Sequence, residues 1–191
     1  MFSRLEVIPS AGRLVAISTA GLILTYGEGL IATSEPLEVE KCGLSALKLL
    51  DFQCPSTSCY ALVGSESGWI SLLQWRREDA FDLVNAFSTH DSTVTEVETP
   101  QLPNECPEFV TVLSVGLDCR LVVSRWGLAG TEVVTLQTIT LNVAFPQCIL
   151  VAATGNVQEG GGSESDSKMG DSNIECLVAG CGLESVVIHV H

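Results

Sequence analysis

The residues of this 191-residue chain that could perform chemistry are few. His90, Ser114 and Asp118 are the residue types of a hydrolytic triad, in which a histidine activates a serine hydroxyl and a carboxylate orients the histidine. Such an enzyme also needs a nucleophile elbow, yet the segment Gly64–Gly68 (GSESG) has Glu66 at its centre instead of a serine. We therefore predict no catalytic residue among these side chains.

A second pattern suggests a nucleotide cofactor. Residues 27–32 (GEGLIA) match the dinucleotide-binding fingerprint and follow a strand-like run. The fingerprint requires a helix that opens at the glycines, and Pro36 lies where the interior of that helix would be. We interpret the segment as a turn and expect no cofactor.

Metal binding is weakly indicated. The eight cysteines contain no C-x2-C pair, and their closest pairs are spaced C-x4-C, which is a poor zinc signal. His189 and His191 lie on one face of the last predicted strand, from which they could meet Cys176 or Cys181. Histidine pairs on strands are more often incidental, so we expect no metal site.

The elements that position these residues are strands. Apolar residues occur in short runs of Val, Ile, Leu and Thr, broken by Gly, Pro, Asn, Asp and Ser, which is the strand pattern. Four segments share the form of a strand, a tight turn and a second strand; the first three recur at an interval of about 50 residues, and an insertion lengthens the last interval. They are Ser18–Tyr26, Ser65–Trp75, Ser114–Trp126 and Ala179–Val190.

The repeat predicts an all-β fold, a partial β-propeller with about four blades of four antiparallel strands. Residues 1–41 form a first, partial blade with a connecting strand, residues 42–89 a second blade and residues 90–140 a third. Residues 141–191 form a fourth, incomplete blade, whose first strand we expect at Ala144–Ala153. Its acidic Gly/Ser-rich segment, residues 154–173, has no apolar anchor and is predicted to be a disordered loop.

A partial ring has uncovered ends. One four-stranded sheet exposes two apolar faces and is stable only when neighbouring sheets cover both. Four blades leave two open flanks. We therefore expect further blades outside this chain, or docking of the partial ring on another chain.

Three tryptophans, Trp69, Trp75 and Trp126, belong to the predicted blade strands. We expect them to act as aromatic anchors buried between blades. The alternative is that they mark a groove for a partner, because tryptophan is enriched at the energetic centres of interfaces.

Charge and hydropathy indicate which classes of partner and which cellular compartment to expect. Nine Lys and Arg against 23 Asp and Glu give a formal net charge of -14, which repels a phosphate backbone. The longest uncharged apolar run, Leu14–Gly27, is shorter than the roughly 20 residues of a membrane-spanning helix. The N-terminus has no secretory pattern, and a chain this rich in apolar residues needs no disulfides. We expect a cytoplasmic protein with reduced thiols and no membrane contact.

From Cys42 onward the segments form a recognisable order: CGLSALKLL, YALVGSESGWISLL, THDSTVTEVE, VTVLSVGLDCRLVVSRW and CLVAGCGLESVVIHV. This order resembles the C-terminal WD-repeat region of the WD-repeat regulatory subunit of the tRNA wobble-position 2'-O-methyltransferase complex. The resemblance implies a WD-repeat-type propeller, in which His90, Ser114 and Asp118 belong to the hydrogen-bonded tetrad of one blade. One departure is Ser124, which occupies the usual tryptophan station, with Trp126 two residues further on.

The resemblance also implies a function. The chain would be a non-catalytic scaffold and regulator of an FtsJ-type tRNA 2'-O-methyltransferase that acts on the anticodon wobble nucleotide. The methyl donor would bind to the partner enzyme, and tRNA would be contacted only indirectly. The alternatives are a generic WD-repeat adaptor of another protein complex and a small propeller enzyme, which the missing motifs disfavour.

Overall fold

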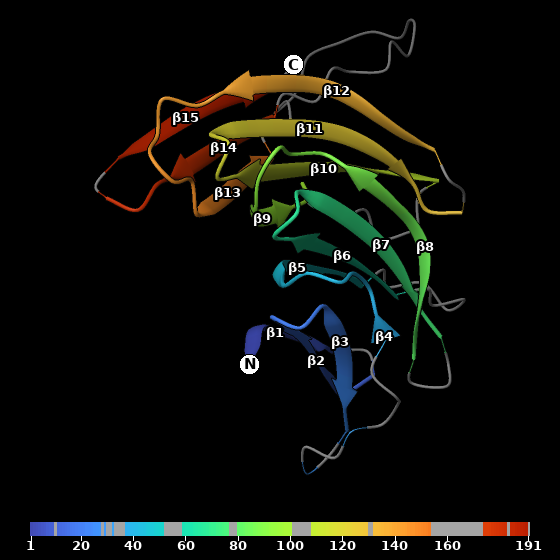
Figure 1. Cartoon of the computed structure of the whole chain (residues 1–191). Helices are drawn as coiled ribbons and strands as arrows, with labels where there is room; N and C mark the ends of the chain where they lie inside the picture. Colours follow the sequence, from blue (N-terminus) through green and yellow to red (C-terminus); the bar gives the residue numbers. More distant parts are fainter. Residues whose placement is uncertain are drawn as a thin grey trace, which may run out of the picture.

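The fold consists of four antiparallel β-sheets that follow one another along the chain (Figure 1). The computed structural model describes the chain except residues 10, 28, 30, 31, 33–36, 52–58, 77–79, 101–107, 130, 131, 154–173, 183 and 191. All fifteen named elements in the described part are strands, so the predicted all-β class is confirmed. The predicted loop 154–173 lies outside the described residues.

Each sheet is a simple meander of consecutive strands. The first contains β1 (Phe2–Ile8), β2 (Arg13–Ser18), β3 (Leu22–Tyr26) and β4 (Leu37–Glu38). The second contains β5 (Leu44–Asp51), β6 (Cys59–Ser65), β7 (Trp69–Trp75) and β8 (Phe81–Ser88). The third contains β9 (Val94–Glu98), β10 (Phe109–Gly116), β11 (Arg120–Gly127) and β12 (Val133–Thr140). The fourth contains β13 (Cys148–Ala153), β14 (Ile174–Ala179) and β15 (Ser185–Val190).

The start of the fourth sheet differs from the sequence-based prediction. A strand was expected from Ala144, but β13 begins only at Cys148. Phe145 has a positive φ of 49°, which no extended strand contains, and Pro146 has no amide hydrogen to give to a ladder. The linker between β12 and β13 therefore bends until residue 147.

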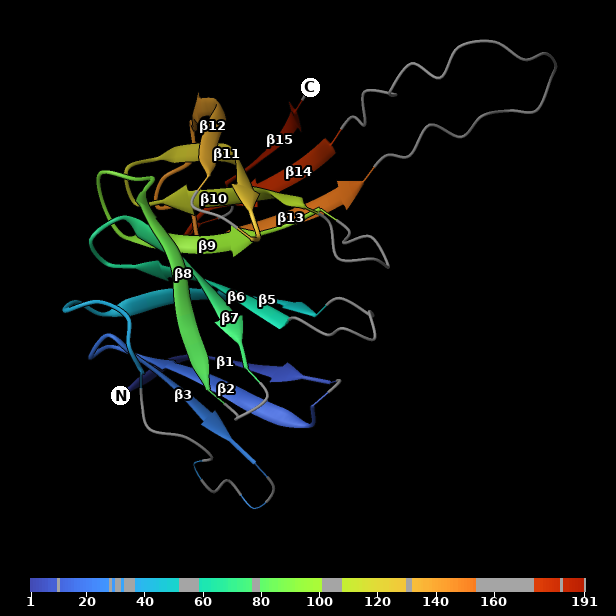
Figure 2. The same ribbon diagram turned by 90° about the vertical axis from the view of Figure 1, so that its right-hand side faces the viewer.

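The sheets stack face to face along an open arc. The first strands β1, β5, β9 and β13 are neighbours in that order on the inner side, and the sheets fan outward from them (Figures 1 and 2). This is the arrangement of propeller blades around a centre, so the predicted partial β-propeller is confirmed. The first and fourth sheets lie at opposite ends of the arc.

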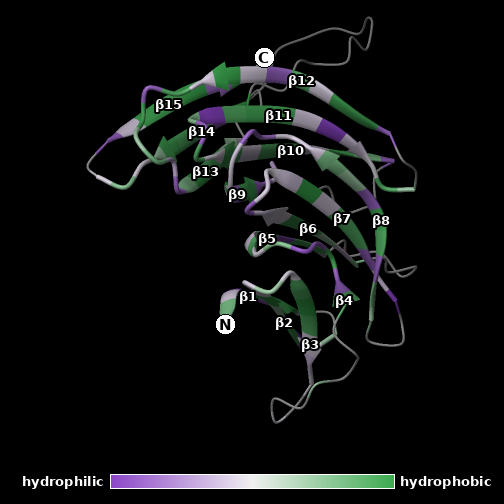
Figure 3. Cartoon of the chain, viewed as in Figure 1, coloured by the Kyte–Doolittle hydropathy of each residue, from purple (hydrophilic) through white to green (hydrophobic). Residues whose placement is uncertain are grey.

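Apolar residues fill the three junctions between sheets, and Figure 3 shows how many positions along the strands are hydrophobic. Alternation along each strand sends neighbouring side chains to opposite junctions. In β6, for example, Ala61 and Val63 pack toward the first sheet while Tyr60 and Leu62 pack toward the third. An inner sheet is thus buried on both faces, as its near-continuous apolar strands require.

A hydroxyl group bridges each junction near the centre of the arc. Ser45 Oγ lies 2.6 Å from Val94 O of the next sheet and 3.3 Å from Gly64 O of its own sheet. Ser3 makes the equivalent pair of contacts with Leu44 O and Ile17 O, at 2.5 and 3.3 Å. Thr95 Oγ1 repeats the contact with the fourth sheet, at 2.5 Å from Pro146 O. We call these three side chains the bridging hydroxyls.

The turns between the second and third strands also contact the following sheet. The carbonyl of Gly68 accepts hydrogen bonds from the amides of Thr89 and His90, both at 3.0 Å, in the linker that enters the third sheet. Gly68 has φ +88°, and a Cβ there would lie 2.1 Å from His90 O. The backbone approaches this closely only because residue 68 has no side chain.

Two further properties belong to the described residues as a whole. Within them, no helix is long and apolar enough to cross a membrane. Six of the eight cysteines are also described, and these six are free thiols: Cys42, Cys59, Cys119, Cys148, Cys176 and Cys181.

The Gly68 contact gives a stability test with a matched control. Gly12 also has a positive φ, +61°, but a Cβ there would meet nothing within 4 Å. Gly12→Ala should cost only the backbone term of about 1 to 2 kcal/mol. Gly68→Ala should cost clearly more, because its methyl group would also displace the linker that carries His90. Urea unfolding of both variants measures the difference, and equal losses of stability would contradict the inter-sheet contact.

Candidate functional site

His90, Ser114 and Asp118 lie together at the junction of the second and third sheets. His90 Nε2 is 2.9 Å from Ser114 Oγ, and His90 Nδ1 is 3.0 Å from Asp118 Oδ1. The carboxylate can only accept, so Nδ1–H donates to Asp118 and the serine hydroxyl donates to Nε2. Asp118 also accepts hydrogen bonds from the amides of Asp91, at 3.1 Å, and Arg120, at 3.2 Å. Every ring nitrogen of the histidine is thus paired.

Three different segments supply this polar set. His90 comes from the linker between β8 and β9, Ser114 from β10, and Asp118 from the turn that joins β10 to β11. Gly116 makes room for the imidazole ring, because a Cβ there would lie 2.8 Å from His90 Nδ1. The set therefore fixes a linker, a strand and a turn to one another.

The geometry is unsuited to catalysis although the residue types match a hydrolytic triad. His90 is 3% exposed and Ser114 is 0% exposed. A nucleophilic serine needs a position about 3 Å from its hydroxyl where a substrate carbonyl can sit, beside donors for the oxyanion. The hydroxyl of Ser114 is enclosed by protein, so the set stabilises the fold.

The three tryptophans occupy three different environments. Trp126 is completely buried, and its Nε1–H donates to Ser124 Oγ at 2.9 Å. Trp75 is half-buried and packs edge-to-face on Phe81, with ring centroids 5.0 Å apart. Trp69 is 41% exposed, so the expectation of a buried anchor is wrong at this position. It begins β7 beside the turn, opposite the exposed Ser88, where the sheet edge meets solvent.

Ser124 therefore separates Trp126 from the polar set. The indole bonds to Ser124 on its own strand instead of Ser114 on the neighbouring strand. Since Trp126 stands two residues after Ser124 on β11, its ring points to the same face of the strand as Ser124. The result is a three-membered His–Ser–Asp set and a separate Trp–Ser pair.

A different polar set holds the junction of the first and second sheets. Ser67 Oγ donates to Glu40 Oε1 at 2.6 Å and lies 2.9 Å from Ser65 Oγ. Glu40 takes the place of His90, since the amides of both residues bond to the carbonyl of a turn glycine. Burial alone would raise the pKa of the Glu40 carboxyl, but the Ser65 and Ser67 hydroxyls and the Cys42 thiol together hold this pKa below its ordinary value.

Charged side chains line the inner strands. Arg4 on β1 reaches across β5 to Glu96 on β9, at 3.1 Å, and its Nε donates to Ser45 O on the way, at 3.4 Å. Lys48 on β5 pairs with Glu98 on β9 at 2.7 Å. These ion pairs are partly exposed, so each contributes little stability by itself. They tie three neighbouring sheets together at the centre of the arc.

Two of the inner carboxyl groups are held in an unfavourable environment for their charge. Burial raises the pKa of Glu6, with a further rise from the nearby Glu98, although the Leu49 amide donates to Glu6 Oε2 at 2.8 Å. Burial also raises the pKa of Glu96, against the opposing effect of Arg4. The inner surface thus carries carboxyl groups that gain protons more readily than exposed ones.

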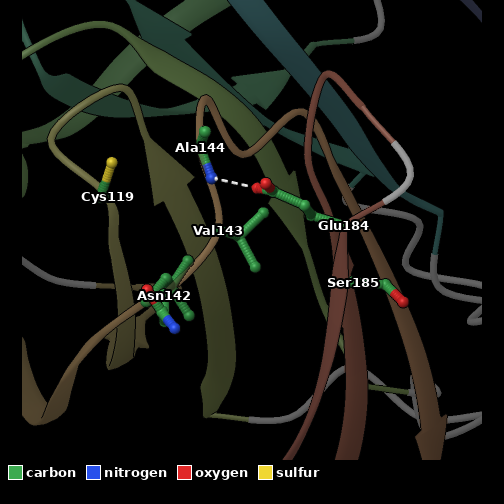
Figure 4. A pocket seen from close by; sticks show the side chains of 7 residues that line it. Cys119, Asn142, Val143, Ala144, Glu184 and Ser185 are labelled. Atoms are coloured by element: carbon green, nitrogen blue, oxygen red, sulfur yellow. Dashed lines mark hydrogen bonds between the residues drawn. The ribbon is translucent and has the colours of Figure 1, made fainter.

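A cavity lies between the third and fourth sheets, beside the turn that contains Cys119. It has a volume of about 710 Å³, and Figure 4 shows Cys119, Asn142 and Ser185 around it. Glu184 Oε2 accepts a hydrogen bond from the Ala144 amide across it, at 3.0 Å. Glu184 is the one carboxylate among the described lining residues, and it is already bonded to the Ala144 amide. The described lining therefore offers no pair of groups for acid–base chemistry.

A metal site at the C-terminal strand is not formed by the described residues. His189 lies on the outer face of β15 and pairs with Glu175 at 3.1 Å. Cys176 is buried on the opposite face of the sheet, in the core against the third sheet. His191 is outside the described residues. No group of three or more potential ligands occurs in the part of the chain that the structure describes.

Sequence analysis missed the bridging hydroxyls and the Glu40 set. Ser3, Ser45 and Thr95 stand at equivalent positions, because each is the second residue of the first strand of its sheet. The recurrence of a hydroxyl residue at this station was the available signal. Nothing in the sequence indicated that Glu40 would take the position that His90 has in the third sheet. That position is defined only where the linker between two sheets packs on the turn of the preceding sheet.

Comparisons with solved structures agree on the architecture. The crystal structure of the computationally designed Ika8 protein matches 99% of this chain with a TM-score of 0.62 and 11% identity. The crystal structure of the designed Ika4 protein matches 100% of this chain with a TM-score of 0.62 and 10% identity. This chain covers 92% of the Ika4 chain but only 46% of the Ika8 chain. Such identities establish the fold alone. No protein-family model and no curated protein matches the sequence.

The polar set makes His90→Ala a test of its structural role. Removing the imidazole takes away the buried partner of Ser114 and one of the three hydrogen-bond donors to Asp118, which should cost about 1 to 3 kcal/mol of unfolding free energy. His189→Ala, at an exposed position on β15, is the matched control and should be close to neutral. Thermal and urea unfolding measure both, and an unchanged melting curve for His90→Ala would show that the set contributes nothing.

The raised pKa of Glu6 gives a pH-dependent prediction. Between the unfolded pKa of about 4.5 and the higher folded pKa, the folded state binds more protons, so stability from this group falls as the pH rises. Glu6→Gln should therefore raise stability at neutral pH and have no such effect below about pH 4.5. Glu38→Gln, on an exposed residue, controls for the change in net charge. The measurement is urea unfolding from pH 4 to 8, and a parallel pH profile for Glu6→Gln and the parent would contradict the prediction.

Proposed function

We propose that this chain is a non-catalytic WD-repeat scaffold that regulates an FtsJ-type tRNA 2'-O-methyltransferase acting on the anticodon wobble nucleotide. The observation that carries the proposal is the His90–Ser114–Asp118 set, found in the blade whose sequence segments resemble that regulatory subunit. The same order of segments ends with residues 176–190 on β14 and β15. The chain would work in the cytoplasm.

The chemistry of the described residues supports a scaffold. The buried His90 and Ser114 are engaged with each other and with Asp118 inside a sheet junction. Exposed apolar side chains remain on several strands, among them Trp69 at 41% and Leu83 at 51%. Protein partners use such aromatic and apolar positions as anchors.

The charge favours an indirect relation to tRNA. A formal net charge of -14 repels phosphate groups, so the positive surface that grips tRNA would belong to the methyltransferase or to additional blades. The methyl donor would likewise bind to the enzyme. In this arrangement the scaffold contributes orientation and stability to its partner.

The proposal predicts a physical and a functional outcome. The tagged chain should recover an FtsJ-type methyltransferase from cell extract, and adding the purified chain should increase 2'-O-methylation of the wobble nucleotide by that enzyme. The chain alone should transfer no methyl group. His90→Ala, which loosens the third sheet, should weaken recovery, whereas His189→Ala should leave it unchanged.

Two results would contradict the proposal. Recovery of ligase or coat subunits without a methyltransferase would favour a generic WD-repeat adaptor. Turnover of a substrate by the purified chain, abolished by one polar substitution, would favour an enzyme.

A further inference from the structure

The outer face of the fourth sheet is an uncovered apolar surface. Leu150, Leu177 and Val187 stand directly opposite one another on β13, β14 and β15. They are 64, 36 and 58% exposed. The other face of the same sheet is buried against the third sheet. We call the uncovered side the trailing face.

Equivalent positions in the preceding sheets are buried. Leu177 stands four residues before the turn amide of Cys181, just as Leu113 stands four residues before that of Leu117. Leu113 is 0% exposed, and its cross-strand neighbour Val123, the counterpart of Val187, is 1% exposed. The trailing face therefore has the residues of an inter-sheet junction but no sheet against it.

The first sheet has the complementary uncovered side, which we call the leading face. Leu5 and Val7 lie two and four residues after the bridging hydroxyl Ser3 and are 56 and 58% exposed. Their counterparts Leu47 and Leu49, two and four residues after Ser45, are 3 and 9% exposed because the first sheet covers them. The leading face thus has the side chains that inner sheets use toward a preceding sheet.

The two faces match each other in chemistry but cannot meet within one chain. Every junction inside the arc joins one trailing side to one leading side, and the free examples of each lie at opposite ends (Figures 1 and 3). A second copy of this chain presents such a leading face. The two solved structures differ in length by the factor that two copies would give: this arc covers 92% of the Ika4 chain and 46% of the Ika8 chain. A chain about twice as long thus contains the arc as one half.

We propose that two copies of this chain close head to tail into one ring, with the trailing face of each copy packed on the leading face of the other. A two-fold axis makes the two junctions identical and leaves no free apolar end. The ring would contain eight sheets, within the range of about four to eight blades found in propellers.

Polar stations at the two ends also match. Gln147 occupies the position in the fourth sheet that the bridging hydroxyls occupy in the other sheets. The carbonyls of Leu44 and Pro146 each accept from a bridging hydroxyl of the preceding sheet, and Gln147 follows Pro146 as Ser45 follows Leu44. Its side chain is exposed. In the ring, its amide would face the Phe2 carbonyl of the other copy, which is the counterpart of Leu44 O. The closing junctions would repeat the polar contact of the inner ones.

The mass in solution tests closure. Sedimentation or light scattering of the purified chain should give twice 20.3 kDa at micromolar concentration. A monomer would overturn the proposal and leave the faces to blades of another polypeptide. A mass that keeps rising with concentration would indicate open, unclosed stacking and would also overturn it. The measurement uses no methyltransferase, so its result is independent of the proposed function.

Charge substitutions on the two faces test the head-to-tail arrangement. Leu5→Glu and Leu150→Lys should each yield a monomer, while Leu136→Glu and Leu136→Lys, on the exposed outer strand β12, should remain dimeric. An equal mixture of Leu5→Glu and Leu150→Lys should restore the dimer, because one junction joins the new acid to the new base and the other joins two native faces. Val187→Lys replaces Leu150→Lys if circular dichroism shows that the latter is unfolded. A dimer of either single variant alone would overturn the arrangement.

Discussion

The structure depends on the mutual covering of apolar sheet faces. Each inner sheet is buried on both sides, and removal of any neighbour would expose a full row of Leu, Val and Ile side chains. Burial contributes roughly 25 cal/mol for each Å² of apolar surface, so these junctions are the main source of stability. The same requirement explains why the two end faces are chemically incomplete by themselves.

Polar contacts fix the position of each sheet relative to the next, because hydrophobic burial is not directional. The bridging hydroxyls repeat at three junctions with nearly the same geometry. The linker stations do not repeat: His90 with Asp118 serves one junction and Glu40 with Ser67 another. At the third junction the buried apolar Val143 lies against Gly180, as His90 lies against Gly116. A polar residue at this buried station needs a partner, whereas an apolar one needs only space.

This division explains why residues suited to catalysis form a structural set. A histidine, a serine and an aspartate hold a linker, a strand and a turn together because each finds its partners inside the junction. Access separates such a set from an active site, and Ser114 has none. The exposed apolar positions and the two end faces, unlike this set, are open to solvent.

The sequence by itself determined the all-β class and the repeat, because strand periodicity and turn residues act locally. The grouping of His90, Ser114 and Asp118 came from the resemblance to a WD-repeat region. The sequence placed β13 too early, since only the backbone at Phe145 and Pro146 shows where the linker ends. It also buried Trp69, whose exposure depends on its distance from the adjoining sheet. The Glu40 station and the acceptors of the bridging hydroxyls were decided by the tertiary structure alone, because they arise where segments distant in sequence pack face to face.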